Sequence, residues 1–123
     1  MRISKLLSVS ACSLLLGSAG IAQQNALVGQ GAVVRALDRV NGKTIDFEFF
    51  PGETKQIGSL QIDVFECRYP AGNPSGDAFI RLDIREIGAT RLLFMGWMIA
   101  SSPAINALDH PRYDVWALRC IIS

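Results

Sequence analysis

The residues that could do chemistry gather near the carboxyl end of the chain, between positions 96 and 120. Around the single histidine, His110, stand the residue types of a hydrolytic triad, which needs a nucleophile, a base and an orienting carboxylate. The neighbours of these types are Ser101, Ser102, Asp109 and Asp114. No glycine-flanked nucleophile elbow accompanies them. We therefore assign no catalytic residue, and expect His110 to cap the end of a helix or to bond to backbone.

The sequence indicates neither a metal site nor a cofactor. One histidine and scattered carboxylates lack the clustered ligands of zinc sites, and no acidic loop matches a calcium site. Trp97, Trp116 and Tyr113 could stack on a sugar or on a partner's aromatic ring. Packing in the core is the better explanation for each tryptophan, so we expect them to be structural.

The elements that must position these residues are predicted to be β-strands. Asn41-Gly42 separates two runs of alternating polarity, and Asn-Gly is the strongest short signal for a hairpin. A two-residue type I′ turn would place Ala36 opposite Phe47, and Arg35 opposite Glu48 as a favourable charge pair. The face directed at the core would then hold Val34, Ala36, Ile45, Phe47 and Phe49.

Further strands are expected over residues 60–67, 78–87, 91–100 and 112–120. Strict alternation would put Cys67 on the face opposite Val64, and Cys120 on the face opposite Ala117. Several short strands with turn signals between them, and no long amphipathic segment, favour an all-β fold. We predict an antiparallel β-sandwich or a small barrel.

One short helix is expected near residues 103–109, acting as a lid over one end of the sheets. Ser102 can cap its amino end, Pro103 suits the first helical position, and Pro111 would end it. The side chains expected to tuck onto the core are those of Ile105 and Leu108.

The amino end has the pattern of a secretion signal. Arg2 and Lys5 precede an apolar run, and Gly20-Ile21-Ala22 offers small residues to a signal peptidase. We expect a signal peptide over 1–22, cleaved near Ala22, rather than a buried helix or an uncleaved anchor. The short apolar segment before Cys12 argues against a lipoprotein. A flexible lead-in over 23–31 and a single β domain over 32–123 would follow, in the periplasm or outside the cell.

The mature chain is expected to be nearly neutral. Of twelve basic side chains, Arg2 and Lys5 leave with the signal, and eleven acidic side chains remain. Interspersed charges of this kind exclude a nucleic-acid footprint, and we expect no transmembrane span in the mature chain. In an oxidising compartment Cys67 and Cys120 would form a disulfide, the alternative being two buried thiols.

Two motifs resemble a known family: GWM-x-ASSP at 96–103 and L-x-HP-x-YDVW at 108–116, followed by Cys120. Weaker agreement lies in Leu37-Asp38 with Gly42, in Pro51-Gly52-Glu53-Thr54, and in Cys67. On these residues the chain resembles DUF2155, a family of small secreted alphaproteobacterial proteins of unknown function. Ile99 and Asp109 depart from the family pattern but keep the chemical type. The resemblance implies secretion, a single domain and the Cys67 to Cys120 pair, and implies no catalytic residue.

The function expected from these observations is that of a non-catalytic envelope protein, a binding or accessory module for a protein partner or cell-envelope component. The alternative is a small periplasmic hydrolase using His110 with nearby carboxylates. The binding reading predicts an exposed apolar or aromatic patch beside the segment from 103 to 111. The candidate binding residues are Ser101, Asn106, Asp109, His110, Arg112 and Tyr113. The residues expected to be structural are Cys67, Cys120, Trp97, Trp116, Ser102, Pro103 and Pro111.

Overall fold

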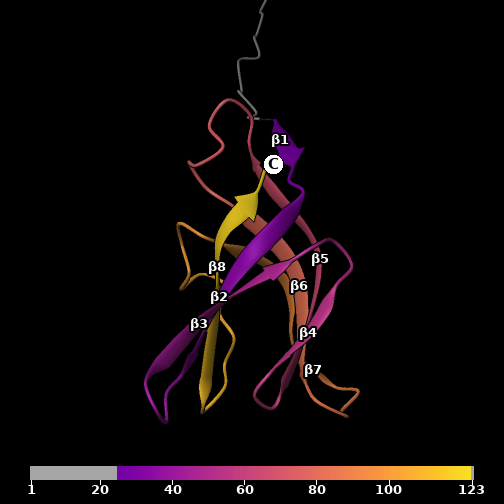
Figure 1. The fold of residues 1–123 in the computed structure, drawn as a ribbon, viewed down its shortest axis with the longest axis vertical. Helices are drawn as coiled ribbons and strands as arrows, with labels where there is room; N and C mark the ends of the chain where they lie inside the picture. Colours follow the sequence, from indigo (N-terminus) through magenta and orange to yellow (C-terminus); the bar gives the residue numbers. More distant parts are fainter. Residues whose placement is uncertain (1–24, 123) are drawn as a thin grey trace, which may run out of the picture.

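The structure is a computed structural model that describes residues 25–122, and these contain eight strands and no helix (Figure 1). The expected signal peptide, its cleavage near Ala22 and the question of Cys12 lie outside the described residues. The strands are β1 (Ala26–Val28), β2 (Gly31–Asp38), β3 (Lys43–Phe49), β4 (Thr54–Ile57), β5 (Leu60–Pro70), β6 (Phe79–Glu86), β7 (Leu92–Ile99) and β8 (Tyr113–Ile121).

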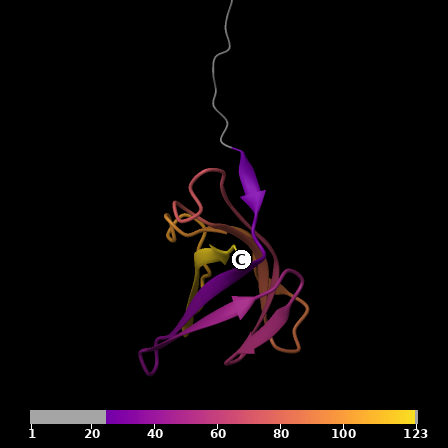
Figure 2. The same ribbon diagram turned by 45° about the horizontal axis from the view of Figure 1, so that its top comes forward.

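The strands form two antiparallel sheets, as predicted for a β-sandwich. One sheet has the order β1-β5-β6-β7, with β4 also pairing with β5, and the other has the order β3-β2-β8. The three residues of β1 are all exposed, and Figure 2 shows this strand at one end of the molecule, where it pairs with the end of β5. Strands β2, β5, β6 and β8 therefore supply most of the core.

The core lies between the two sheets, and its largest fully buried side chains come from alternating positions. In β6, Ile80, Leu82 and Ile84 are 0% exposed while the residues between them face outward. This alternation is the pattern expected of a sheet that has one solvated face. On β5 the inward residues are Leu60, Ile62 and Val64.

The β2–β3 hairpin forms where expected, but its register differs from the prediction by two residues. Ala36 pairs with Ile45 rather than with Phe47, because the connection spans four residues instead of two. The Gly42 N–H donates to the Asp38 carbonyl at 2.8 Å, and Asn41 Oδ1 accepts from the Lys43 N–H at 2.9 Å. A shift of two keeps every side chain on its predicted face.

Two consequences of the longer turn correct the prediction. Arg35 forms its ion pair with Asp46, at 2.7 Å, rather than with Glu48. Ile45 is 54% exposed although it lies on the inward face of its strand. The inward face is open there because the tip of the hairpin diverges from the opposite sheet (Figure 1), which leaves a hollow beside Ile45.

Strict alternation predicted that each cysteine would lie on the outward face of its strand. A β-bulge in each of the two strands turns the cysteine inward instead. In β5 the register shifts between Val64 and Glu66, so that Cys67 is 0% exposed. In β8 the register shifts after Ala117, and Cys120 is 6% exposed. An extra residue in one strand re-aims all the side chains that follow it.

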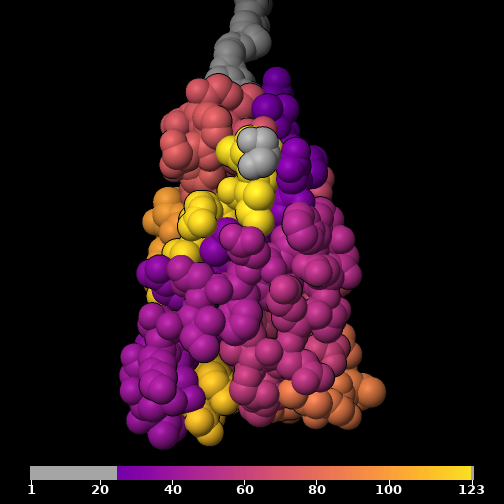
Figure 3. Space-filling view, viewed as in Figure 1, coloured from indigo at the N-terminus to yellow at the C-terminus, as the bar shows by residue number. Residues whose placement is uncertain are grey.

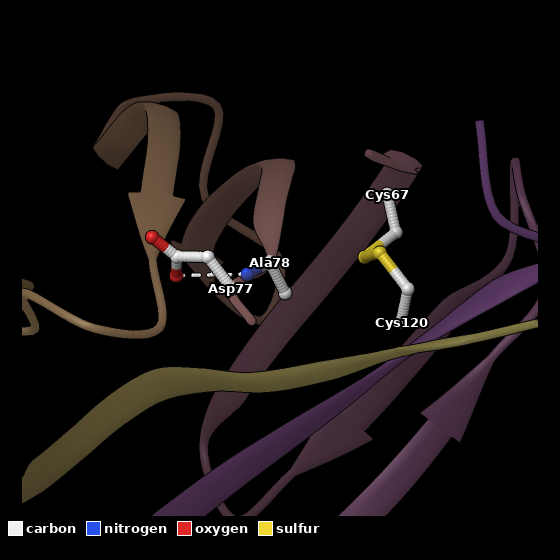
Figure 4. Close-up of a disulfide and its surroundings, with 4 residues drawn as sticks. All are labelled: Cys67, Asp77, Ala78 and Cys120. Atoms are coloured by element: carbon white, nitrogen blue, oxygen red, sulfur yellow. Dashed lines mark hydrogen bonds between the residues drawn. A yellow bond between two sulfur atoms is a disulfide. The ribbon is translucent and has the colours of Figure 1, made fainter. Parts of the chain in front are cut away.

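The two inward cysteines form the expected disulfide, which joins β5 of one sheet to β8 of the other (Figure 4). Their Cα atoms lie 5.6 Å apart, and 53 positions separate them in the chain. The disulfide therefore ties the two sheets together near the carboxyl end of β8.

Candidate binding surface at the lid

The lid is the segment of residues 101–112 that connects β7 to β8, and it consists of turns rather than the short helix predicted near 103–109. The Ser102 N–H donates to the Ile99 carbonyl at 3.1 Å, and the Ile105 N–H donates to the Ser102 carbonyl at 3.1 Å. A segment of about one helical turn gains too few hydrogen bonds to offset helix nucleation. The lid is instead held in place by its side chains.

The amino end of the lid is fixed by Asp77, which precedes β6. Its Oδ2 accepts from the Ser101 hydroxyl at 2.7 Å, and its Oδ1 accepts from the Ser101 N–H at 3.0 Å. The same Oδ1 accepts from the Ala78 N–H at 2.8 Å (Figure 4). Ser101 therefore anchors the lid, and its hydroxyl donates to Asp77 rather than to His110.

The middle of the lid is tied to the edge of β7. The Asn106 side-chain amide donates to the Trp97 carbonyl at 2.8 Å. Two residues later Leu108 enters the core and is 5% exposed. Ile105, which was expected to tuck in beside it, is 70% exposed.

His110 fastens the carboxyl end of the lid with both of its ring nitrogens. Nδ1 accepts from the backbone N–H groups of Arg112 at 3.0 Å and Tyr113 at 3.1 Å. Nδ1 therefore carries no proton, and Nε2 donates to Glu86 Oε1 at 2.7 Å. The side chain is 10% exposed, so the ring is a buried connector between the lid and the end of β6.

Two arginine–carboxylate pairs connect the lid and β8 to the turn of the β2–β3 hairpin. Arg112 donates to both carboxylate oxygens of Asp38, at 3.1 and 2.9 Å. Arg39 contacts both carboxylate oxygens of Asp114 and donates to the His110 carbonyl at 2.9 Å. Bidentate geometry of this kind fixes orientation as well as distance.

Between these anchors the lid presents an uncharged surface. From 101 to 108 the sequence SSPAINAL holds no ionisable side chain, and five consecutive residues from 103 to 107 are exposed. A hollow of about 320 Å³ lies beside them, against the start of β8. Its lining residues are Pro103, Ala104, Ala107, Leu108, Asp114, Val115 and Trp116.

The candidate binding residues differ in their placement. Asp109 and Arg112 are exposed, whereas Tyr113 is 5% exposed and cannot offer its ring to a large partner. Neither tryptophan packs in the core as expected: Trp116 is half-buried and lines the hollow. Trp97 is half-buried on the outer face of its sheet, with the Arg68 guanidinium 5.4 Å from its ring.

The carboxylates that bind the lid residues could not be recognised from the sequence. Asp77 and Glu86 lie 24 positions before the residues that they hold, and Asp38 lies 74 positions before Arg112. Nothing local marks such residues, because an isolated carboxylate is ordinarily a solvated surface group. Within residues 25–122, no group of three or more histidine, cysteine or acidic side chains could hold a metal ion.

Three carboxyl groups, two at the lid anchors and one on the β2–β3 hairpin, have a pKa that is lowered from its ordinary value, because hydrogen-bond donors stabilise the charged form. They are Asp38 beside Arg112, Asp46 beside Arg35, and Glu86 beside His110 and Ser59. A carboxyl whose pKa is lower in the folded than in the unfolded protein stabilises the fold above its unfolded pKa, about 4. That stability is lost as the pH falls through the folded pKa.

We therefore expect the contribution of these three carboxyls to be constant above about pH 5 and to decline below about pH 4. Urea unfolding at pH 7, 5 and 3 measures the decline. Asp38→Asn should reduce the difference in unfolding free energy between pH 7 and pH 3, because one of the three groups no longer titrates. An undiminished difference in this variant would contradict the assignment.

Comparison with known proteins places the chain in a family. Residues 32–120 match the family described as "Uncharacterized protein conserved in bacteria (DUF2155)". The chain is also similar to Uncharacterized protein RP359 of Rickettsia prowazekii (strain Madrid E), with 27% identity over 88 residues. That match covers 69% of this chain and 57% of the relative, so the chain spans little more than half of the relative's length. No solved structure matches the chain.

The family match includes the lid and both cysteines of the disulfide. In the part of the chain that the structure describes, no helix is long and apolar enough to cross a membrane. The matched residues make up more than half of the chain. The protein therefore belongs to the DUF2155 family, as the GWM-x-ASSP and L-x-HP-x-YDVW motifs predicted.

Proposed function

We propose that the protein is a non-catalytic binding module of the cell envelope, secreted or periplasmic, that docks a protein partner or an envelope component through its lid. One observation carries this proposal: an uncharged, exposed loop tip lies beside a mostly apolar hollow of about 320 Å³ and is tied down at both ends. The secretion pattern at the amino end supports the location.

The anchoring of the lid favours binding, because a pre-ordered loop loses little conformational entropy when a partner docks. Ser101, Asn106 and His110 each hold the loop to a different strand or strand end. Between Asn106 and Ser101 the chain exposes the apolar side chain of Ile105. An exposed apolar group on a rigid support is a recurring form of interface anchor.

The geometry of His110 favours binding over the alternative of a hydrolase. A general base needs a nitrogen lone pair directed at the nucleophile. In His110 the Nδ1 lone pair accepts two backbone N–H groups, and the Nε2 proton is directed at Glu86. The hydroxyl of Ser101 donates to Asp77. Proton abstraction by this ring would require that its bonds to the start of β8 be broken.

The proposal is tested by photo-crosslinking in intact cells. A photoreactive amino acid at position 105 should capture a specific envelope protein or polymer, because the side chain of Ile105 stands on the exposed tip of the lid. The matched control is position 50. Phe50 is apolar and 59% exposed, and it follows β3, which lies at the far edge of its sheet from β8.

A product formed at position 105 and not at position 50 would support docking through the lid. When the photoreactive amino acid is placed at position 104 instead, Ile105→Glu should abolish capture without changing the melting temperature by more than a few degrees, because exposed positions tolerate charge. Equal capture at both positions, or capture that survives Ile105→Glu when a crosslinker is placed at Ala104, would overturn the proposal.

A further inference from the structure

A second hollow, away from the exposed residues 103–107 of the lid, lies where the tip of the β2–β3 hairpin diverges from the β4–β5 turn. We call it the overhang pocket; its volume is about 210 Å³. Figure 3 shows the hairpin protruding at the lower left of the molecule. The apolar wall consists of Ala36, Ile45 and Ile57, and the polar wall includes Asn41, Lys43 and Tyr113. The pocket thus occupies inter-sheet space that the core side chains leave unfilled.

The apolar wall explains why Ile45 is half-exposed on an inward face. Ile45 pairs with Ala36, and both residues face the interior of the sandwich. Opposite them stands the β4–β5 turn, where Gly58 has φ +58° and a Cβ atom would lie 2.1 Å from the Tyr113 hydroxyl oxygen. The tyrosine ring therefore packs directly on the glycine backbone and closes the floor of the pocket.

One of the basic side chains that line the pocket has no acidic partner there. Two basic side chains and one acidic side chain line it, namely Lys43, Arg112 and Asp38. Arg112 and Asp38 neutralise each other through two hydrogen bonds. The ion pairs among residues 25–122 include none to Lys43. The Lys43 ammonium is thus available to an anion at the mouth of an apolar space.

The volume of the pocket suits a small molecule or a single side chain. A volume of 210 Å³ corresponds to about seven water molecules at roughly 30 Å³ each. A branched apolar group of four or five carbons together with a carboxylate has this size. A phosphate would leave the apolar wall without a partner, and only the end of a long acyl chain would fit inside the pocket.

We propose that the overhang pocket binds a small amphipathic carboxylate, with the carboxylate at Lys43 and Asn41 and a branched apolar group against Ile45 and Ile57. Two sources share this chemistry: a free short branched acid, and the carboxyl-terminal leucine of a peptide. Capture of a carboxyl end is one of the recurring modes of peptide recognition. The pocket shares Arg112 with the lid but none of the exposed residues 103–107, so either proposal can fail without the other.

The test is titration of the folded, disulfide-bonded protein, followed by amide NMR shifts. The probes are 4-methylpentanoate, its neutral amide 4-methylpentanamide, and the peptides Gly-Gly-Leu and Gly-Gly-Leu-amide. The acid or the free peptide should shift the amides of Asn41, Lys43 and Gly58. The neutral amides should bind about tenfold more weakly, because they lose a charge-assisted hydrogen bond.

Lys43→Met should weaken binding of the carboxylate about tenfold. The matched control is Lys55→Met, because Lys55 lies over the Phe49 ring, at 5.8 Å, and does not line the pocket. If the free acid alone binds, the source is a small acid; if the peptide binds more tightly, it is a peptide terminus. No saturable shift at these amides, equal binding of acid and amide, or equal loss in both lysine variants would overturn the proposal.

Discussion

Replacing Cys67 and Cys120 together by alanine is expected to lower the free energy of unfolding by about 4 kcal/mol. The disulfide closes a loop between residues 53 positions apart, and loop-closure entropy in the unfolded chain gives a value of that size. At about 4–8 °C per kcal/mol for a domain of this length, the melting temperature should fall by roughly 15 °C or more. Thermal unfolding followed by circular dichroism measures the change.

Alanine is the appropriate replacement because both cysteines are buried, and a serine hydroxyl would add the cost of an unpaired polar group. A reducing agent supplies the control. It should lower the melting temperature of the natural protein toward that of the double variant, and leave the double variant itself unchanged. A double variant that melts within a few degrees of the natural protein would show that the disulfide adds little to stability.

His110→Ala is expected to lower the free energy of unfolding by about 2–3 kcal/mol. The substitution leaves the N–H groups of Arg112 and Tyr113 without their acceptor and removes the hydrogen bond to Glu86. Loss of a partner by largely buried polar groups has a cost of about 1–3 kcal/mol each, and Arg112 is partly solvated. Urea unfolding at pH 7 measures the effect.

His110→Asn is the matched variant. An asparagine side-chain oxygen accepts from N–H groups two and three positions further along the chain, so it can replace Nδ1 but cannot reach Glu86. The loss in this variant should be about half of that in His110→Ala. Loss of turnover in both variants, measured under conditions in which both remain folded, would instead indicate a hydrolase centred on His110.

The sequence predicted the parts of the fold that depend on local periodicity. The alternation in residues 78–87 placed Ile80, Leu82 and Ile84 correctly in the core. In the β2–β3 hairpin the faces were right although the register was not, because the two arrangements differ by an even number of residues. Asn41 and Gly42 both lie in the turn, but Asp38 extends it by accepting the N–H of Gly42.

The parts that could not be predicted depend on contacts between distant residues. A bulge is an extra residue relative to a partner strand, and the sequence of β5 alone does not reveal that partner. For the same reason the lid was expected to be a helix. Its proline and serine suit a helix start, but bonds to Asp77 and Glu86 hold it in an irregular form. The sequence thus singled out the segment between β7 and β8, but it did not predict the residues that hold this segment in place.

The paired bulges in β5 and β8 have a consequence for oxidative folding. Each bulge alone decides whether the thiol three residues after Val64 or Ala117 faces the interior or the solvent. A chain that paired either strand one residue out of register would hold one thiol between the sheets and the other outside, where they cannot meet. The Cys67–Cys120 disulfide is therefore compatible only with the native alignment of both strands, and once formed it opposes a one-residue slip of either strand.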